Sequence, residues 1–419
     1  MPSPVPDMHL VRQTFNAVEL DDLEGHLTGG LRRQLQRAAL PAGASVAIAV
    51  GSRGVSPVVE VVRTLARGLR EAGLQPFVVP AMGSHGGGTA EGQESVLADY
   101  GVHEQSAGAP VRATMNTVVL GTTASGITVH LDAEAAAADG VIVIGRVKPH
   151  TGFRGPIESG LCKMSVIGLG NRRGAESLHA HPLATGIPEA AAVTVASGHL
   201  LCGVALVENA FDRPARAEVV PPEAFHATDE ALLKLARELM PRLPLNKLDG
   251  LVIDRMGKNI SGSGMDPNVV GMWRRLSELD RTPDYGWLAV LGLTPESHGN
   301  AVGIGLADLC SRKLADAIDH EALAMNTLTA MALHAAKVPL TLATDRACYE
   351  TVLHLAERST DQPLRIGRIR NTLELETFWV SEGVLNDLPG TCEIIDSASP
   401  FGFDADDAIL ETGAFEPSA

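Results

Sequence analysis

Four glycine-rich segments of this sequence contain, between them, cations, hydroxyl groups and imidazoles, which are residue types that bind anions and exchange protons. Glycine lets backbone N–H groups approach a phosphate or carboxylate, and a following helix N-terminus adds a favourable partial charge. The segments are Gly51–Ser56, Gly83–Gly88, Arg146–Phe153 and Met256–Gly264, and each follows a short apolar run. Together they predict a binding site for an anionic ligand.

The cations of these segments suit anion binding in different ways. Arg53 can hold a carboxylate or phosphate through two parallel hydrogen bonds, whereas Lys148 and Lys258 act as point charges. Gly86 and Gly87 are expected to bring backbone N–H groups close to the ligand.

Two histidines, His85 and His150, lie inside these segments. Imidazole titrates near neutral pH, so it can take up a proton and return it. A single histidine is usually a surface residue or one with satisfied hydrogen bonds. Two of them on converging loops, beside arginine and lysine, favour reversible acid–base chemistry.

A further region, from residue 158 to 181, contains a lysine in an apolar stretch and two histidines close together in the sequence. Lys163 lies in an apolar stretch between glycine-rich turns. Burial there would lower the lysine pKa and favour covalent chemistry, although the ammonium group could also reach the surface. His179 and His181 are expected on or just after a short helix. Side chains two residues apart on a helix point about 200° apart, so only one of them can face a given ligand.

The elements that position these residues follow the alternation of strands and helices that is typical of parallel α/β sheets. Apolar runs predict strands at 45–51, 76–81, 140–145, 202–209, 248–254 and 287–293. Ligands bind at the carboxyl ends of such strands, where the glycine-rich segments lie. Residues 116–131 predict a hairpin that turns at 124–126.

The length of 419 residues favours two domains, because a single core rarely grows that large. A helix ending near Met240 is followed by PRLPLNK, whose two prolines break it. We predict two α/β domains with mostly parallel sheets and the active site in the cleft between them. The first, residues 1–245, would carry the cofactor and the catalytic histidines, and the second would span 246–395. The tail, 396–419, would pack back on one of the two domains, with the N-terminal domain as the first candidate, or it would be poorly ordered.

Composition excludes several classes of function. A net charge of -16 and a pI near 5.3 argue against nucleic-acid binding, which needs clustered Lys and Arg. No signal peptide and no apolar run of membrane-spanning length is visible, so a cytoplasmic protein without a membrane partner is expected. The five cysteines are scattered without a CxxC pair, which favours reduced thiols over disulfides or a zinc site.

The motifs taken together resemble the nickel-dependent lactate racemases over most of the chain. The likeness rests on GSRGVSP, MGSHGGG, KPHTGF, ESGLCKMSVIGLGNRRGAESLH and GKNISGSGMDPNVVG. In that family a nickel-pincer nucleotide, pyridinium-3-thioamide-5-thiocarboxylic acid mononucleotide, is bonded to a lysine. Its sulfur-containing arms and a histidine bind the nickel, so no metal-binding cysteines are needed.

The resemblance implies a role for each matching residue. His85 and His150 would be the catalytic pair, and Lys163 would form the bond to the nucleotide. His179 would be the nickel ligand, with His181 as the alternative. The resemblance assigns the remaining contacts to cofactor binding (Arg53, Gly86, Gly87, Lys148) and to substrate binding (Arg53, Lys258).

The implied activity is racemisation or epimerisation of a 2-hydroxy acid by proton-coupled hydride transfer, on a cofactor that separate maturation proteins make. One feature departs from the family pattern. The founding lactate racemases have a shorter, serine- and glycine-rich link between the catalytic histidine and the tethering lysine. Here the link carries Arg154 and Glu158, which indicates a divergent branch with its own substrate pocket.

Two other functions remain open. Gly168-x-Gly170-x-x-x-Gly174, with two arginines inside it, suggests an NADP-linked oxidoreductase. Against that, Pro182 and Pro188 are expected to interrupt the helix that should follow, and no strand ending in an acidic residue comes about 20 residues later. The second alternative is a catalytically inactive protein of the same fold that binds an anionic ligand.

Overall fold

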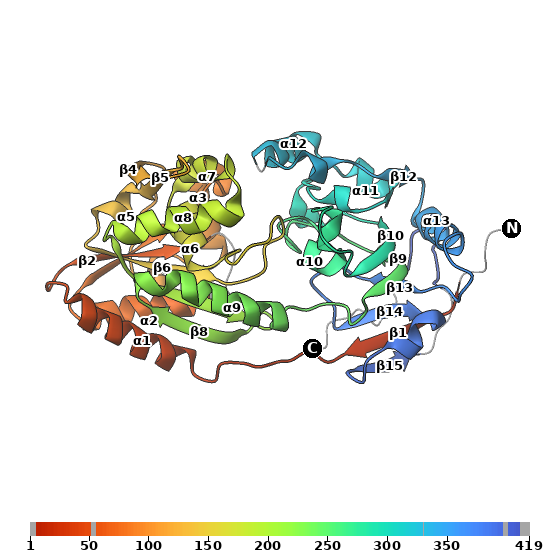
Figure 1. Cartoon of the computed structure of the whole chain (residues 1–419), viewed down its shortest axis with the longest axis horizontal. Coiled ribbons are helices and arrows are strands. Elements are labelled where there is room, and N and C mark those ends of the chain that lie inside the picture. Colours follow the sequence, from red (N-terminus) through yellow and green to blue (C-terminus); the bar gives the residue numbers. More distant parts are fainter. Residues whose placement is uncertain (1–5, 52–55, 330, 397–400, 411–419) are drawn as a thin grey trace. The chain divides into compact units, whose positions relative to one another are not determined.

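The chain forms two compact units, each built on its own sheet (Figure 1). The computed structural model describes residues 6–51, 56–329, 331–396 and 401–410. Asn16–Met240 form one unit, called here the continuous unit. Met1–Phe15 and Pro241–Ala419 form the other, the two-segment unit. Both combine mostly parallel strands with helices, so the predicted α/β class is confirmed.

The continuous unit contains a five-stranded sheet in the order β3-β2-β6-β7-β8. Its first four strands are parallel, and β8 runs antiparallel to β7. Their bounds are Ser45–Val50 (β2), Gln75–Pro80 (β3), Gly140–Arg146 (β6), Leu200–Glu208 (β7) and Pro214–Val220 (β8). The four parallel strands match the apolar runs that predicted them.

Two helical layers cover this sheet because alternate side chains of each strand point to opposite faces. Val46 and Ile48 of β2 pack with α1 (Leu23–Ala38) and α2 (Val58–Glu71). Ala47 and Ala49 face the second core, which includes side chains of α6 to α9. These helices span Leu161–Lys163 (α6), Asn171–His179 (α7), Leu183–Ala196 (α8) and Phe225–Leu239 (α9). Figure 1 shows α1 and α2 on one side of the sheet and α8 on the other.

The predicted hairpin is present, with strands β4 (Thr117–Thr122) and β5 (Thr128–Asp132) pairing antiparallel. The remaining short helices of this unit are η1 (Gly86–Gly88), α3 (Ala90–Asp99), α4 (Glu104–Ala107), α5 (Ala133–Ala137), the π-helical turn η2 (Met164–Gly168) and η3 (Pro222–Ala224).

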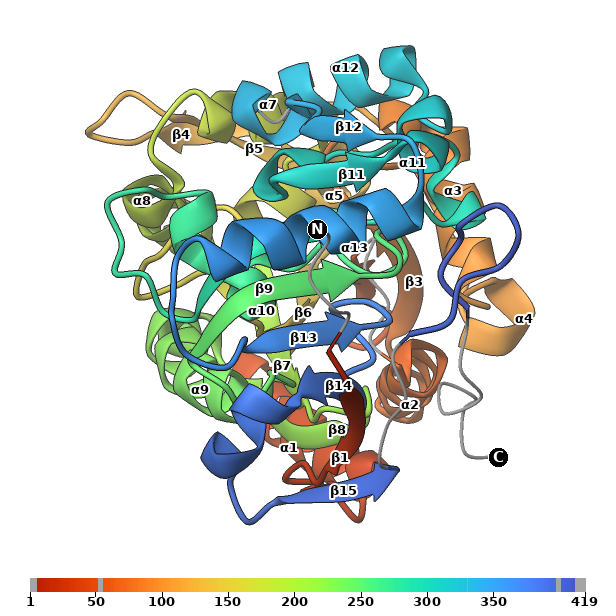
Figure 2. The same ribbon diagram turned by 90° about the vertical axis from the view of Figure 1, so that its right-hand side faces the viewer.

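The two-segment unit has an eight-stranded sheet in the order β12-β11-β10-β9-β13-β14-β1-β15. The strands from β12 to β13 are parallel, and those from β14 onward are antiparallel to their neighbours. Their bounds are Met8–Gln13 (β1), Lys247–Ile253 (β9), Asp284–Val290 (β10), Leu309–Ser311 (β11), Leu340–Leu342 (β12), Ile366–Ile369 (β13), Thr377–Ser381 (β14) and Cys392–Asp396 (β15). Figure 2 shows β12 and β15 at opposite ends of this sheet, with α13 (Asp345–Glu357) across its near face.

Short helices complete the two-segment unit. They are α10 (Pro267–Val270), η4 (Met272–Arg274), η5 (Pro295–Ser297), η6 (Ile304–Leu306), α11 (Arg312–Asp316), α12 (His320–Thr329), η7 (Leu333–Ala336) and η8 (Glu382–Asp387). None of the helices within the described ranges is long and apolar enough to span a membrane.

The ends of the chain differ from the sequence-based division. That division counted the first residues with domain 1–245, whereas β1 pairs with β14 and β15 of the two-segment unit. Its Met8, Leu10 and Val11 are buried, so the strand is held there by both its ladder and its apolar side chains. The described part of the tail packs on the same unit, since Phe401 lies in a core cluster with Tyr349.

Candidate active site

His85 and His150 follow two strands of the same sheet edge in the continuous unit. His85 comes after β3 and is exposed, and His150 comes after β6 and is half-buried. Both strands run parallel to β2, which lies between them, so their carboxyl ends meet at one edge. Lys148 shares the loop of His150, while Arg53 lies outside the described residues.

The His85 loop is anchored to the segment that carries Lys163. The backbone N–H of Gly83 donates to the carbonyl of Gly168 at 3.1 Å. Gln93 is fully buried, and its amide donates to the carbonyls of Gly83 at 2.9 Å and His85 at 3.4 Å. The loop that presents His85 is therefore held by hydrogen bonds from two directions.

Gly86 and Gly87 differ in what a side chain would meet, and this gives a matched test of the loop. Both have left-handed φ angles, 63° and 67°, so alanine is strained at either site by about 1–2 kcal/mol. A Cβ at Gly86 would lie 2.6 Å from the backbone carbon of Gly92, whereas one at Gly87 meets nothing within 4 Å. We expect Gly86→Ala to lower the free energy of unfolding by at least about 1 kcal/mol more than Gly87→Ala, as measured by chemical denaturation. Equal losses would contradict this packing.

Lys163 ends the short helix α6, whose start is capped from another helix. The carboxylate of Asp229, on α9, accepts the N–H groups of Leu161 at 2.9 Å and Cys162 at 2.8 Å. Burial raises the pKa of Asp229 to about 7, and the two N–H donors oppose that rise. The π-helical turn η2 follows at once, a distortion that often occurs at functional sites. Lys163 itself is half-buried.

His179 is the last residue of α7 and interacts electrostatically with Lys163. Burial, first, and the positive charge of Lys163, second, lower the pKa of His179 below its ordinary value. At neutral pH the imidazole is therefore uncharged, the form that binds metal ions. His181 lies beyond the end of the helix, with its N–H bonded to the carbonyl of Leu178. The expected 200° separation does not apply, because only His179 is helical.

Removing the charge of Lys163 is expected to raise the pKa of His179. In Lys163→Met the Coulombic contribution disappears, while burial continues to hold the pKa below its ordinary value. An NMR titration of the His179 ring measures the change. Lys234→Met, which removes an exposed lysine of the same unit, is the control and leaves the titration unchanged. A His179 titration identical in wild type and Lys163→Met would show that the two groups do not interact.

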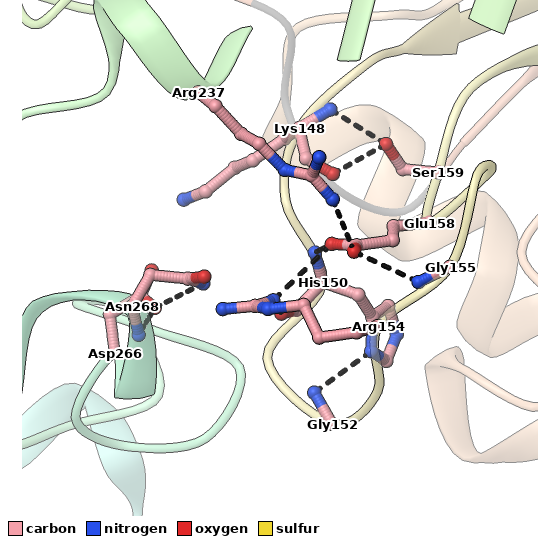
Figure 3. A network of polar contacts seen from close by, with 10 residues as sticks. All are labelled: Lys148, His150, Gly152, Arg154, Gly155, Glu158, Ser159, Arg237, Asp266 and Asn268. Carbon is pink, nitrogen blue, oxygen red and sulfur yellow. Dashed lines mark hydrogen bonds and ion pairs between the residues drawn. The ribbon is translucent and has the colours of Figure 1, made fainter. Parts of the chain in front are cut away.

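The His150 loop is closed by hydrogen bonds from both of its ends (Figure 3). The hydroxyl of Ser159 accepts the N–H of Lys148 and donates to its carbonyl, both at 2.6 Å. The buried carboxylate of Glu158 accepts the N–H of His150 at 2.8 Å. The backbone of this loop is therefore held by hydrogen bonds at both Lys148 and His150, the two proposed site residues.

Lys258 follows β9 in the two-segment unit, as the sequence predicted. Its ammonium group donates to the carbonyl of Gly262 at 2.7 Å and to the side chain of Asn326 at 3.0 Å. Its backbone N–H donates to Ser297 at 2.9 Å. The lysine is thus held by its own loop and by α12.

Sequence reasoning missed Asp229, Arg237 and Gln93, which support the site from outside its loops. Only Asp229 left a signal in the sequence. It occupies the same helical stripe as Leu232, Leu233 and Ala236, which are all buried. A carboxylate at such a position must find partners, because an unpaired buried charge is unstable.

The glycines of the dinucleotide-like pattern lie at a different kind of turn from the one that pattern needs. Gly168 and Gly170 connect the π-helical turn to α7, and no strand directly precedes them. Pro188 also does not interrupt a helix, because it lies inside α8. The described residues contain no group of three or more His, Cys, Asp and Glu side chains arranged to hold a metal ion.

Comparison with known protein families shows which family part of the continuous unit resembles. Residues 33–186 match the family described as the lactate racemase N-terminal domain. This segment is similar to the N-terminal domain of the lactate racemases. It contains His85, His150, Lys163 and His179, so the family resemblance predicted from these motifs is confirmed.

One solved structure shows a related fold over a longer part of the chain. The lactate racemase apoprotein from Thermoanaerobacterium thermosaccharolyticum aligns over 87% of this chain and 93% of its own, with a TM-score of 0.52 and 16% identity. A protein from Thermotoga maritima aligns over 65% and 71%, with a TM-score of 0.46 and 16% identity. At this identity the first match shows a shared fold. A search of curated protein sequences gives no match.

Proposed function

We propose that this protein racemises or epimerises a 2-hydroxy acid with a nickel-pincer nucleotide bonded to Lys163. The observation that carries the proposal is the interaction of Lys163 with His179 inside a lactate racemase N-terminal domain. A lysine and an uncharged imidazole are the two protein groups that such a cofactor requires, one for the covalent bond and one for nickel. Strands β3 and β6, which flank β2, lead into the two histidine loops of the same unit.

The residues present fit this cofactor. His179 supplies a neutral nitrogen ligand, and imidazole suits nickel. Lys148 and the backbone N–H groups of Gly86 and Gly87 would bind the nucleotide's anionic groups. When bound, the nucleotide would accept a hydride from C2 of the substrate and return it. The protein supplies orientation, cations and bases.

Proton transfer falls to His85 and His150 in this proposal. One imidazole removes the hydroxyl proton as the hydride leaves C2, which gives a planar 2-oxo acid. The other protonates the oxygen when the hydride returns to the opposite face. Two bases are needed because the two enantiomers present their hydroxyl groups in opposite directions. Arg53 would hold the substrate carboxylate.

A chiral assay of the loaded protein tests the proposal. The protein is produced together with the cofactor maturation proteins in the cytoplasm, where we place its function. It is then incubated with single enantiomers of a panel of 2-hydroxy acids. Chiral chromatography is expected to show interconversion of one of them, absent from protein made without the maturation proteins. NADP-dependent formation of a 2-oxo acid would favour an oxidoreductase, and binding without turnover an inactive binding protein. Either result would contradict the proposal.

A further inference from the structure

The carboxylate of Glu158 is fully buried at the centre of the loop that carries His150 (Figure 3). Its Oε2 atom accepts hydrogen bonds from the backbone N–H of His150 at 2.8 Å and from Arg154 at 3.3 Å. Its Oε1 atom accepts from the N–H of Gly155 at 3.1 Å and from Arg237 at 2.7 Å. A buried carboxylate needs such partners, since an unpaired charge is unstable away from water. The loop is therefore folded around one side chain.

The imidazole ring of His150 is contacted by other residues of the same loop. The N–H of Gly152 donates to its Nδ1 atom at 3.0 Å, and the Phe153 ring lies 4.4 Å away between centroids. A ring nitrogen that accepts a hydrogen bond carries no proton, so neutral His150 has its proton on Nε2. Arg154 also donates to the carbonyl of His150 at 3.0 Å. The position of the ring and its tautomer thus depend on the fold of this loop.

Helix α9 contacts both the His150 loop and the helix of Lys163. Arg237 of α9 binds Glu158, while Asp229 of the same helix caps α6 through the N–H groups of Leu161 and Cys162. Arg237 lies eight positions after Asp229, which corresponds to a rise of about 12 Å along a helix. One rigid element therefore makes a charged contact with each of the two segments.

We propose that Glu158 and Arg237 are positioning residues, which align the His150 ring with Lys163 through α9. The proposal rests on the proposed function for the roles of His150 and Lys163. Neither positioning residue needs to touch the substrate, because both act through the backbone of the His150 loop. A displacement of about 1 Å at a reacting group can reduce a rate about 10²-fold, so the alignment has consequences for turnover.

The experiment compares Glu158→Gln, Arg237→Met and Arg237→Lys with the wild type. Glutamine keeps the size of Glu158 but turns one acceptor oxygen into a donor, which cannot accept from an N–H group. NMR of ¹⁵N-labelled histidine in the full chain, without turnover, is expected to show the Nε2–H tautomer of His150 in the wild type. Glu158→Gln and Arg237→Met are expected to lose this single tautomer.

The same variants are then assayed with cofactor. We expect kcat to fall about 10- to 100-fold in Glu158→Gln and Arg237→Met while KM changes little. Arg237→Lys, which keeps the positive charge, restores part of kcat and of the tautomer signal. Should Glu158→Gln fail to fold, Arg237→Met carries the same prediction.

Asp345→Asn in the two-segment unit is the matched control. Asp345 is also a buried carboxylate, and it binds Lys313 and the N–H of Ile409. Its substitution is expected to lower thermal stability and leave the His150 tautomer and kcat unchanged. A wild-type tautomer and wild-type kcat in folded Glu158→Gln and Arg237→Met would overturn the positioning role. Absence of racemisation in the wild type would refute the proposed function instead, and the tautomer measurement would still test the positioning.

Discussion

His85→Ala and His150→Ala are expected to react with opposite enantiomers in the first half-reaction, the removal of hydride from the substrate. If each histidine serves the hydroxyl group of one enantiomer, racemisation uses both in sequence and neither variant turns over in either direction. Each variant should still complete one half-reaction, in which hydride leaves the enantiomer whose base remains. The two loops follow β3 and β6, the strands on either side of β2, at the same edge of the sheet of the continuous unit.

Rapid-mixing absorbance of the loaded variants, with each pure enantiomer, measures this preference. Loss of a positioned acid–base group typically costs a factor of 10²–10⁴, well above the effect of a loosened distant loop. The preference should therefore invert between the variants. If both keep near-full racemisation, or both respond equally to either enantiomer, the two-base proposal fails and the histidines are loop residues beside an anion site.

His179→Ala is expected to lose nickel, and with it racemisation, whereas His181→Ala keeps both. His179 ends α7 with a lowered pKa and interacts with Lys163, while His181 lies past the helix end. Losing a direct ligand should exceed the 10- to 100-fold cost that is typical of outer-shell partners of metal sites. Metal analysis of the purified, loaded proteins measures the content. Nickel retained in His179→Ala and lost in His181→Ala would reverse the assignment.

The parallel strands could be predicted because a strand buried on both faces must be an apolar run, whatever its neighbours are. The run at 140–145 became β6 with its bounds nearly unchanged. β1 could not be found in the same way. Its partners β14 and β15 come more than 360 residues later, so nothing local indicates its sheet. The assignment of the chain's first residues failed for that reason.

The candidate site shows the same contrast between local and distant information. His85, His150 and Lys163 lie in motifs that a single loop or turn defines, so they could be proposed from the sequence. Arg237 could not, since it reaches Glu158 from a helix 79 residues further along the chain. Asp229 is similarly far from the helix α6 that it caps, and only its place in an apolar stripe marked it.

Intact-protein mass spectrometry of the loaded chain, followed by peptide mapping and nickel analysis, tests the central claim most directly. We predict a covalent nucleotide adduct on Lys163, nickel in the same preparation, and neither in a folded Lys163→Ala variant. Lys148 is the nearest alternative tether in the sequence. An adduct of unchanged mass in Lys163→Ala, or a wild-type chain that stays unmodified after production with the maturation proteins, would contradict the account.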